Sequence, residues 1–519
     1  MFRDSPTYIV TPITPGIIIA VIALYALSRL SQRYDPKEPP VLPQKVPFLG
    51  HILGLLQHGL KYYATLSSRY DLPIYTLQML NQRTYIVNSP ELVIAVQRQT
   101  KTLSFQPFVA AMLPRLFLID RDGMEILKRN MDGEEGDWGL IPDSRRESWP
   151  ILAPGPQLDL MLQSMLSALL PFLNEFSGAI EGNNATDLYA WARRAFTLAG
   201  TETLYGSENP FRWEPGLEDA FWAFEKDATF LLLGVAPRWI AGKAYNAREM
   251  ILNAMKRYNS YSGQENSSDL TKARYNTYTK YGLSSDGIAH FELSSIIGLL
   301  INATPSVFWL LFYIYSVPGL LEDVRLEIAN VTSTVMLKTQ DDQTKHSINV
   351  LKLQERCPLL LSTYRETLRL KTNNVYTRWV QEDTLLNDRY LLKEGSIVQV
   401  PGASMHMDPA LWGADVKDFN PRRFIKGDAN HRQGAFRTFG GGASLCPGRH
   451  FALIEIVATA AMFVMRYEME PQGGGWREPR TDGNDVVGSI SPPTSRLDVA
   501  VTTRKGYEGD QWDFVEVRS

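Results

Sequence analysis

Cysteine is scarce in this chain, and a strong net charge of either sign is absent. The 519 residues include two cysteines, Cys357 and Cys446, which excludes a disulfide framework. The net charge of −3 gives no reason to expect nucleic-acid binding. We find no internal repeat, low-complexity segment or charge run that would mark a domain break. Because 44% of the residues are hydrophobic, the chain can bury a large core.

The N-terminal region has a long stretch without charge. Residues 5–28 carry no charged side chain, and this length reaches the ~20 residues needed to cross a bilayer. Arg29 and Arg33 follow directly, which favours a cytosolic location for the rest of the chain. A cleaved signal peptide is the alternative, but no small-residue cleavage site precedes these arginines. We expect a membrane anchor over 1–33, a proline-rich hinge over 34–50 and one large domain over 51–519.

The remaining pattern predicts a mainly α fold with a minor β-sheet. Strands are expected at 74–77, 84–87 and across 376–400, and helical periodicity dominates between 90 and 335. Residues 258–288 are polar and rich in Ser, Asn and Tyr, so we expect a mobile surface connection there. The tail over 486–503 resembles a β-hairpin with its tip near 488–493.

Cys446 follows a glycine run and precedes an apolar helical segment. Pro447 suits the first position of that helix. A cysteine at a helix N-terminus is exposed to the positive end of the dipole, which predicts a lowered thiol pKa. Residues 440–442 are all glycine, so their amides can turn toward the sulfur. A buried, inert cysteine is the alternative.

The spacing of Phe439, Gly442, Cys446 and Gly448 fits F-x-x-G-x-x-x-C-x-G. This motif resembles the haem loop of the cytochrome P450 family. The resemblance implies the P450 fold, which is mainly α with a minor β-sheet region, and a bound haem b. It also implies that Cys446 is the thiolate ligand of the iron, that Phe439 shields the sulfur from water, and that Gly448 leaves room for the porphyrin.

A second motif also resembles the family. Glu366 and Arg369 lie three residues apart in a helical segment and can pair. With Arg423 of the Pro-Arg-Arg-Phe motif, the resemblance implies a buried charge triad behind the haem. Glu322 and Arg325 share the same spacing, and we interpret that second pair as a solvated helix surface.

The residues expected to hold the haem propionates are incomplete in the sequence. Arg378 matches a family position that often binds a propionate, although a surface arginine has the same pattern. Ser444 stands where a propionate-binding Arg or His is common. Neither Trp138 nor Trp149 has a basic residue four positions later, so the W-x-x-x-R pattern is missing.

The expected oxygen-binding helix, 292–315, departs from the family pattern. Asn302 replaces the usual acid, and Ala303 stands at the place of the proton-delivering Thr. Thr304 is one position later, about 100° further round a helix. Pro305 lacks an N–H, so a kink or local unwinding is expected. That distortion either turns Thr304 toward the distal pocket or leaves it capping the freed backbone.

A sub-branch of the family has a similar oxygen helix. Asn302, Pro305, Phe308 and Trp309 resemble the branch of sterol 7α- and 12α-hydroxylases and prostacyclin synthase. That branch contains both monooxygenases and a redox-neutral isomerase. The bulky pair at 299–300 also departs from the small residues that normally flank dioxygen.

The resemblance implies an NADPH- and O₂-dependent monooxygenase in the endoplasmic reticulum membrane, single-pass, with its catalytic domain facing the cytosol. Electrons would come from NADPH–cytochrome P450 reductase, with cytochrome b5 as a second donor. The substrate would be lipophilic and would lie among the oxygen helix, 105–108 and Ile490. Asn302, Thr304 or ordered water would deliver protons.

The haem loop looks most like those of filamentous fungi, which implies tailoring of a terpenoid, steroid or polyketide in secondary metabolism, by hydroxylation or epoxidation. A redox-neutral haem-thiolate isomerase or dehydratase is the alternative, because such an enzyme needs no proton relay. A non-catalytic haem sensor or carrier is a third reading.

Overall fold

The structure is a computed structural model that describes residues 34–44, 46, 49–79, 82–174, 176, 185–232, 234, 236–336, 344–425, 434–482 and 487–518. The expected membrane anchor over 1–33 lies outside these residues. Most of the expected hinge is described, and it lies against the first strand. The backbone N–H of Thr76 donates to Pro40 O at 2.8 Å, and the N–H of Leu42 donates to Thr76 O at 3.0 Å.

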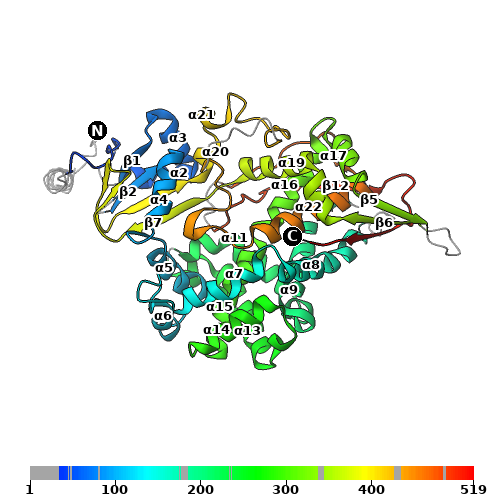
Figure 1. The fold of residues 1–519 in the computed structure, drawn as a ribbon, viewed down its shortest axis with the longest axis horizontal. Helices are drawn as coiled ribbons and strands as arrows, with labels where there is room; N and C mark the ends of the chain where they lie inside the picture. The colour runs from blue at the N-terminus through cyan, green and yellow to red at the C-terminus, as the bar shows by residue number, and fades with distance from the viewer. Residues whose placement is uncertain are drawn as a thin grey trace, which may run out of the picture.

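Helices make up most of the molecule (Figure 1). They are α2 (Gly50–His58), α3 (Lys61–Tyr70), α4 (Pro90–Arg98), α5 (Gln106–Phe117), α6 (Arg121–Lys128), α7 (Leu140–Leu152), α8 (Pro156–Asn174), α9 (Leu188–Tyr205), α10 (Pro210–Trp213), α11 (Leu217–Leu232), α12 (Pro237–Ile240), α13 (Gly242–Ser260), α14 (Asp269–Lys280), α15 (Ser285–Leu300), α16 (Ala303–Ser316), α17 (Leu320–Ala329), α18 (Val350–Arg356), α19 (Pro358–Lys371), α20 (Gly402–His406), α21 (Pro409–Trp412) and α22 (Arg449–Arg466). Short 3-10 turns are η2 (Gly206–Glu208), η3 (Gly263–Asn266) and η4 (Gly442–Ser444).

The strands form small sheets at the two ends of the helical body (Figure 1). They are β1 (Ile74–Met79), β2 (Gln82–Val87), β3 (Leu103–Ser104), β4 (Thr186–Asp187), β5 (Thr332–Met336), β6 (Thr344–Asn349), β7 (Val375–Val380), β8 (Thr384–Leu386), β9 (Tyr390–Leu392), β10 (Ile397–Pro401), β11 (Tyr467–Pro471), β12 (Asp498–Thr503) and β13 (Gln511–Val515). The largest sheet has the order β1-β2-β10-β7-β3, with β10 parallel to β2 and antiparallel to β7. The predicted fold class, mainly α with a minor β region, is confirmed.

The core is built around α16. All its residues from Ala303 to Tyr315 are buried, and it packs against α9, α19 and α22. Within the described residues, the segment Ser285–Ser316 is long and apolar enough to cross a bilayer, but 78% of its most apolar part is buried inside the protein. Its apolar sequence is therefore explained by its place in the core.

The predicted distortion at Pro305 is present. α15 ends at Leu300 and α16 begins at Ala303, so Ile301 and Asn302 form a break between two helices. Pro305 is the third residue of α16 and has no N–H to donate. The first N–H groups of a helix have no acceptor within that helix, so a proline at this position costs α16 no hydrogen bond.

Two expectations about connections were wrong. Residues 258–288 are largely helical, because Ser268 and Ser284 cap the starts of α14 and α15 by accepting from Thr271 N and Gly287 N. Residues 486–503 do not form a hairpin in the part that the structure describes: β12 pairs with β11 and β4. The backbone of Ile490 instead pairs with Thr372, at the end of α19.

Candidate functional site

Cys446 lies in a tight loop between η4 and α22. Its N–H donates to Phe439 O at 2.8 Å, which closes the loop. Gly440 has φ 79°, and a Cβ there would stand 2.7 Å from Ser444 O, so the loop requires glycine at that position. Pro447 precedes α22 by two residues, and so it does not occupy the first helical position as expected.

The thiol faces a cavity of about 660 Å³. Phe439 and Gly448 line it beside Cys446, and Gly298 and Asn302 line it from the oxygen helix. A Cβ on Gly448 would meet no protein atom closer than Cys446 Sγ at 4.0 Å, and one on Gly298 would meet nothing within 4 Å. The two glycines therefore leave free space on both sides of the cavity.

Burial raises the pKa of the Cys446 thiol, and backbone hydrogen bonds from Gly448 and Arg449 only partly offset it. The prediction of a lowered pKa was wrong, because the helix N-terminus does not compensate for the loss of water. The amides that reach the sulfur are those of Gly448 and Arg449 rather than those of the glycine run. A bound metal ion would reverse the shift, since a coordinated thiol is deprotonated.

Asn302 lies at the break in the oxygen helix and is fixed by the C-terminal loop. Its Oδ1 accepts from Ser489 N at 2.7 Å and from Ile490 N at 3.1 Å. Its backbone carbonyl accepts from the hydroxyl of Ser306 at 2.6 Å. Asn302 thus holds the loop that carries Ile490 against the cavity, and the Ser306 hydroxyl adds a bond to a carbonyl that already accepts from Ser306 N at 3.2 Å.

Thr304 takes neither of its two expected roles. Its side chain is fully buried, does not line the cavity, and has no hydrogen-bond partner for its hydroxyl among the described residues. The register of α15 also separates the bulky pair at 299–300. Leu300 is buried away from the cavity, whereas Leu299 lines it together with Gly298, one turn before Asn302, so one bulky residue of the pair remains at the cavity wall.

Arg145 lines one side of the cavity, and Arg378 and Arg437 lie close to it. Arg378 donates to Ser444 Oγ at 2.6 Å and to Thr377 O at 2.9 Å. Burial, followed by the like charges of Arg437 and Arg145, lowers the pKa of Arg378 to about 10. Within the described residues neither Arg378 nor Arg145 forms an ion pair with a carboxylate. Such a cluster lacks negative charge and suits an anionic group.

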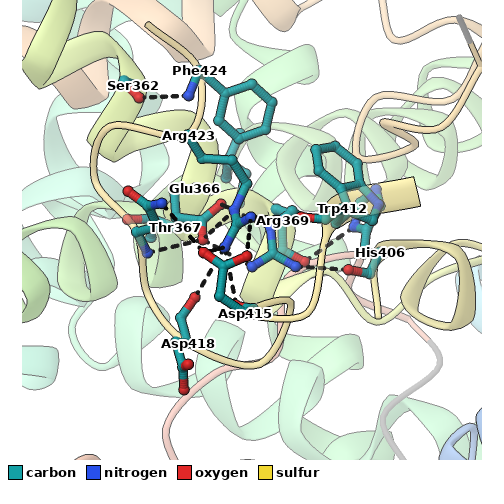
Figure 2. Close-up of polar contacts among 12 residues, drawn as sticks. Ser362, Glu366, Thr367, Arg369, His406, Trp412, Asp415, Asp418, Arg423 and Phe424 are labelled. Atoms are coloured by element: carbon teal, nitrogen blue, oxygen red, sulfur yellow. Dashed lines mark hydrogen bonds and ion pairs between the residues drawn. The ribbon is translucent and has the colours of Figure 1, made fainter. Parts of the chain in front are cut away.

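Glu366, Arg369 and Arg423 meet behind this loop (Figure 2). The carboxylate of Glu366 accepts two hydrogen bonds from Arg369, each 2.8 Å, and one from Arg423 Nε at 3.0 Å. Glu366 and Arg369 are fully buried, and Arg423 is 5% exposed. Asp415 adds a second carboxylate to Arg423, at 3.0 Å. The similarly spaced Glu322, in contrast, is exposed.

Comparison with known proteins decides the family. The cytochrome P450 family model matches residues 236–497. A cytochrome P450 monooxygenase of Hypoxylon pulicicidum is 35% identical over 511 residues, 96% of each chain. The chain belongs to the cytochrome P450 family. Another P450 monooxygenase, from Gibberella zeae, is 28% identical and again spans 96% of each chain. The human 7-alpha-hydroxycholest-4-en-3-one 12-alpha-hydroxylase is 22% identical, covering 88% of this chain and 92% of its own.

This P450 is therefore a haem-thiolate oxidoreductase, and its cavity fits the haem. Cys446 would offer the sulfur ligand, Gly448 and Gly298 leave the space that a flat ring would need, and the arginine cluster would offer positive charge for the propionates. Arg145 was not predicted from the sequence, because the W-x-x-x-R pattern places the arginine four residues after the tryptophan. Arg145 precedes Trp149 by four residues on α7, with its guanidinium carbon 5.5 Å from the ring centroid.

His406 was also missed, and it connects the buried triad of the P450 to the haem loop. The His406 carbonyl accepts from Arg369 Nη1 at 2.7 Å, and its Nδ1 lies 3.0 Å from Arg369 O. Its Nε2 accepts from the backbone N–H of Arg437 at 2.7 Å. Burial, together with the charge of Arg369, lowers the pKa of His406 to about 3, so the imidazole stays neutral. A lone histidine gave no signal of this role.

Proposed function

We propose that this P450 inserts one oxygen atom from O₂ into a lipophilic substrate, by hydroxylation or epoxidation. The observation that carries the proposal is that Cys446 and Asn302 line the same largely apolar cavity. Haem iron with a thiolate ligand supplies oxygen activation when the group is bound. In this chain Cys446 would hold the iron, and Arg378, Arg145 and Arg437 would hold the propionates.

The residues of the protein then position the substrate and deliver protons. Asn302 fixes the loop of Ser489 and Ile490 against the substrate space, and its Nδ2 forms no hydrogen bond within the described residues. Because Asn302 is part of the cavity wall and Thr304 is not, proton delivery uses water held by the Asn302 amide. Phe439 covers the sulfur side and limits access of water.

The wider setting follows from the relatives and the N-terminal sequence. Fungal P450 monooxygenases among the relatives support tailoring of a terpenoid, steroid or polyketide in secondary metabolism. Residues 1–33 would anchor the protein in the endoplasmic reticulum membrane, with 34–50 as hinge and 51–519 as the cytosolic catalytic domain. NADPH–cytochrome P450 reductase would supply electrons, with cytochrome b5 as a second donor.

One observation favours a second function. Ala303 and the buried Thr304 leave no threonine hydroxyl on the oxygen-helix side of the cavity, and a redox-neutral isomerase or dehydratase of the prostacyclin synthase type needs none there.

Product mass separates the two functions. The gene is disrupted in its source, and the compound that accumulates is supplied to microsomes carrying the chain and a reductase, with and without NADPH. A product heavier by one oxygen, formed only with NADPH, supports the monooxygenase. An unchanged mass, or loss of water without NADPH, supports the isomerase or dehydratase. Binding without any product would indicate a haem sensor or carrier. Microsomes carrying C446A serve as the matched control.

A further inference from the structure

The cavity continues away from Cys446, between α7, α14 and α15. Figure 1 shows these three helices stacked in the lower half of the molecule. Leu270, Arg274 and Tyr278 line this part from α14, Ser148 from α7 and Phe291 from α15. We call it the α14 lobe. Its wall includes two buried polar groups that the haem site does not use, Arg274 and Ser148, each 8% exposed.

Arg274 is held by one edge of its guanidinium group. Nε donates to Glu292 Oε1 at 2.9 Å and Nη2 donates to Glu292 Oε2 at 2.8 Å. Nη2 also reaches Thr271 Oγ1 at 3.3 Å. Nη1 forms no hydrogen bond within the part of the chain that the structure describes. Because Arg274 lines the lobe, this nitrogen offers two donors that the protein itself does not satisfy.

Ser148 is the second unsatisfied group. Its hydroxyl is buried and has no hydrogen-bond partner among the described residues. A buried hydroxyl without a partner destabilises the folded protein relative to a bonded one. Ser294 shows the contrast on the same cavity wall, since its hydroxyl donates to Phe291 O at 2.6 Å. Ser148 and Arg274 thus each bring an unsatisfied polar group to the wall of one apolar lobe.

The charge of the lobe decides what it accepts. The positive charge of Arg274 is balanced by Glu292, whose Oε2 also accepts from Tyr205 at 3.1 Å. A carboxylate or phosphate ligand would bring a second, uncompensated anion into a buried site, which is costly. A neutral oxygen that accepts hydrogen bonds has no such cost. Ketone, ether and hydroxyl oxygens meet this requirement.

We propose that the α14 lobe binds a neutral oxygen function of the substrate, such as a ketone or hydroxyl, through Arg274 Nη1 and Ser148 Oγ. The proposal rests on the proposed function, because it assigns a substrate class to that cavity. Phe291 precedes Gly298 by seven residues, which is about 10 Å along a helix. The lobe therefore lies about two turns of α15 from Gly298, and the substrate is an extended apolar molecule that carries its oxygen function away from the reacting carbon.

The test uses the haem-loaded full chain and 1-alkylimidazoles, which coordinate the iron through the free ring nitrogen. Two series with tails of increasing length are compared, one ending in methyl and one in hydroxyl, and the dissociation constant is read from the haem absorption shift. We expect one tail length at which the hydroxyl series binds about three- to tenfold more tightly than the methyl series, as for one or two neutral hydrogen bonds.

S148A is expected to lower this hydroxyl-to-methyl ratio at that tail length only, and R274K to remove most of it. S294A is the matched control and should leave the ratio unchanged, because that hydroxyl is already bonded. If R274K fails to fold, S148A still decides. A ratio that is flat with tail length, or is the same in S148A and wild type, overturns the proposal.

The imidazole titration involves no turnover, so the proposed α14 lobe and the proposed monooxygenase activity are tested independently of each other. A tail preference in a protein that inserts no oxygen supports the lobe and overturns the monooxygenase. Oxygen insertion without a tail preference supports the monooxygenase and overturns the proposed lobe.

Discussion

Replacing Glu366 by glutamine tests whether the buried triad stabilises the haem loop. Glutamine keeps the shape of the side chain but removes the negative charge that two arginines share. Arg423 retains the Asp415 carboxylate at 3.0 Å. Arg369, fully buried, keeps the carbonyl of His406 and the amide oxygen of the glutamine as acceptors, but no carboxylate. The side-chain NH₂ would also face guanidinium N–H groups, which are donors themselves.

The expected loss in the free energy of unfolding is large relative to the total stability of the protein. Removing one partner of a buried ion pair costs about 3–5 kcal/mol, whereas a domain is stable by only about 5–15 kcal/mol. Because Arg369 contacts His406, and His406 accepts from Arg437 N, the loss should extend to the loop of Cys446. We therefore expect E366Q to bind haem incompletely as well as to unfold early.

The assay compares E366Q with E322Q in the purified full chain. Glu322 has the same spacing to an arginine, but it is exposed, and Arg325 pairs with Glu468 instead, at 2.9 Å. Its substitution should change stability by less than about 0.5 kcal/mol. Urea unfolding gives the free energy, and the reduced carbon monoxide complex gives the haem content. If the free energy of unfolding of E366Q lies within about 1 kcal/mol of the wild-type value and its haem content is full, the reasoning is refuted.

Three further predictions concern single residues. N302A should lose the bonds to Ser489 and Ile490 and speed amide hydrogen exchange over 487–493, whereas N302D, which keeps the acceptor, should not. T304V should leave NADPH-dependent turnover unchanged and stability equal or higher, because it removes an unpartnered hydroxyl; a loss of turnover would restore Thr304 as a relay. Since native His406 has a pKa of about 3 and the unfolded residue one near 6.5, the unfolded chain binds more protons below pH 6.5. The free energy of unfolding should therefore fall by about 1.4 kcal/mol per pH unit on acidification from there, and urea titrations of H406Q at pH 7 and 5 should show a smaller fall.

Sequence reasoning succeeded where the relevant interaction is local or the spacing is fixed. Glu366 and Arg369 lie on one helix, so their pairing follows from a separation of three residues. Pro305 predicted the break in the oxygen helix because its missing N–H acts at one defined carbonyl. These conclusions need no knowledge of the surrounding fold.

Sequence reasoning failed where the outcome depends on how deeply a side chain is buried or on which face of a helix it lies. Ala303 lines the cavity and Thr304 does not, so the break at 301–302 does not turn Thr304 toward the distal pocket. The pKa of Cys446 depends on how much water the fold removes, which one loop does not show. Residues 258–288 were read as a surface connection because they are polar, yet that polarity includes the buried Arg274.

The bond between Asn302 and the loop at 489–490 has a consequence for how the protein is made. The two partners, Ser489 and Ile490, follow Asn302 by 187 and 188 positions, so a growing chain can form this bond only when nearly all of its synthesis is complete. Until then an apolar cavity stays open on one side, a state that favours aggregation. A chain that stops shortly before residue 487 would contain Cys446 and the triad, yet could never close that wall, and we expect it to be captured by chaperones rather than to accumulate as folded protein.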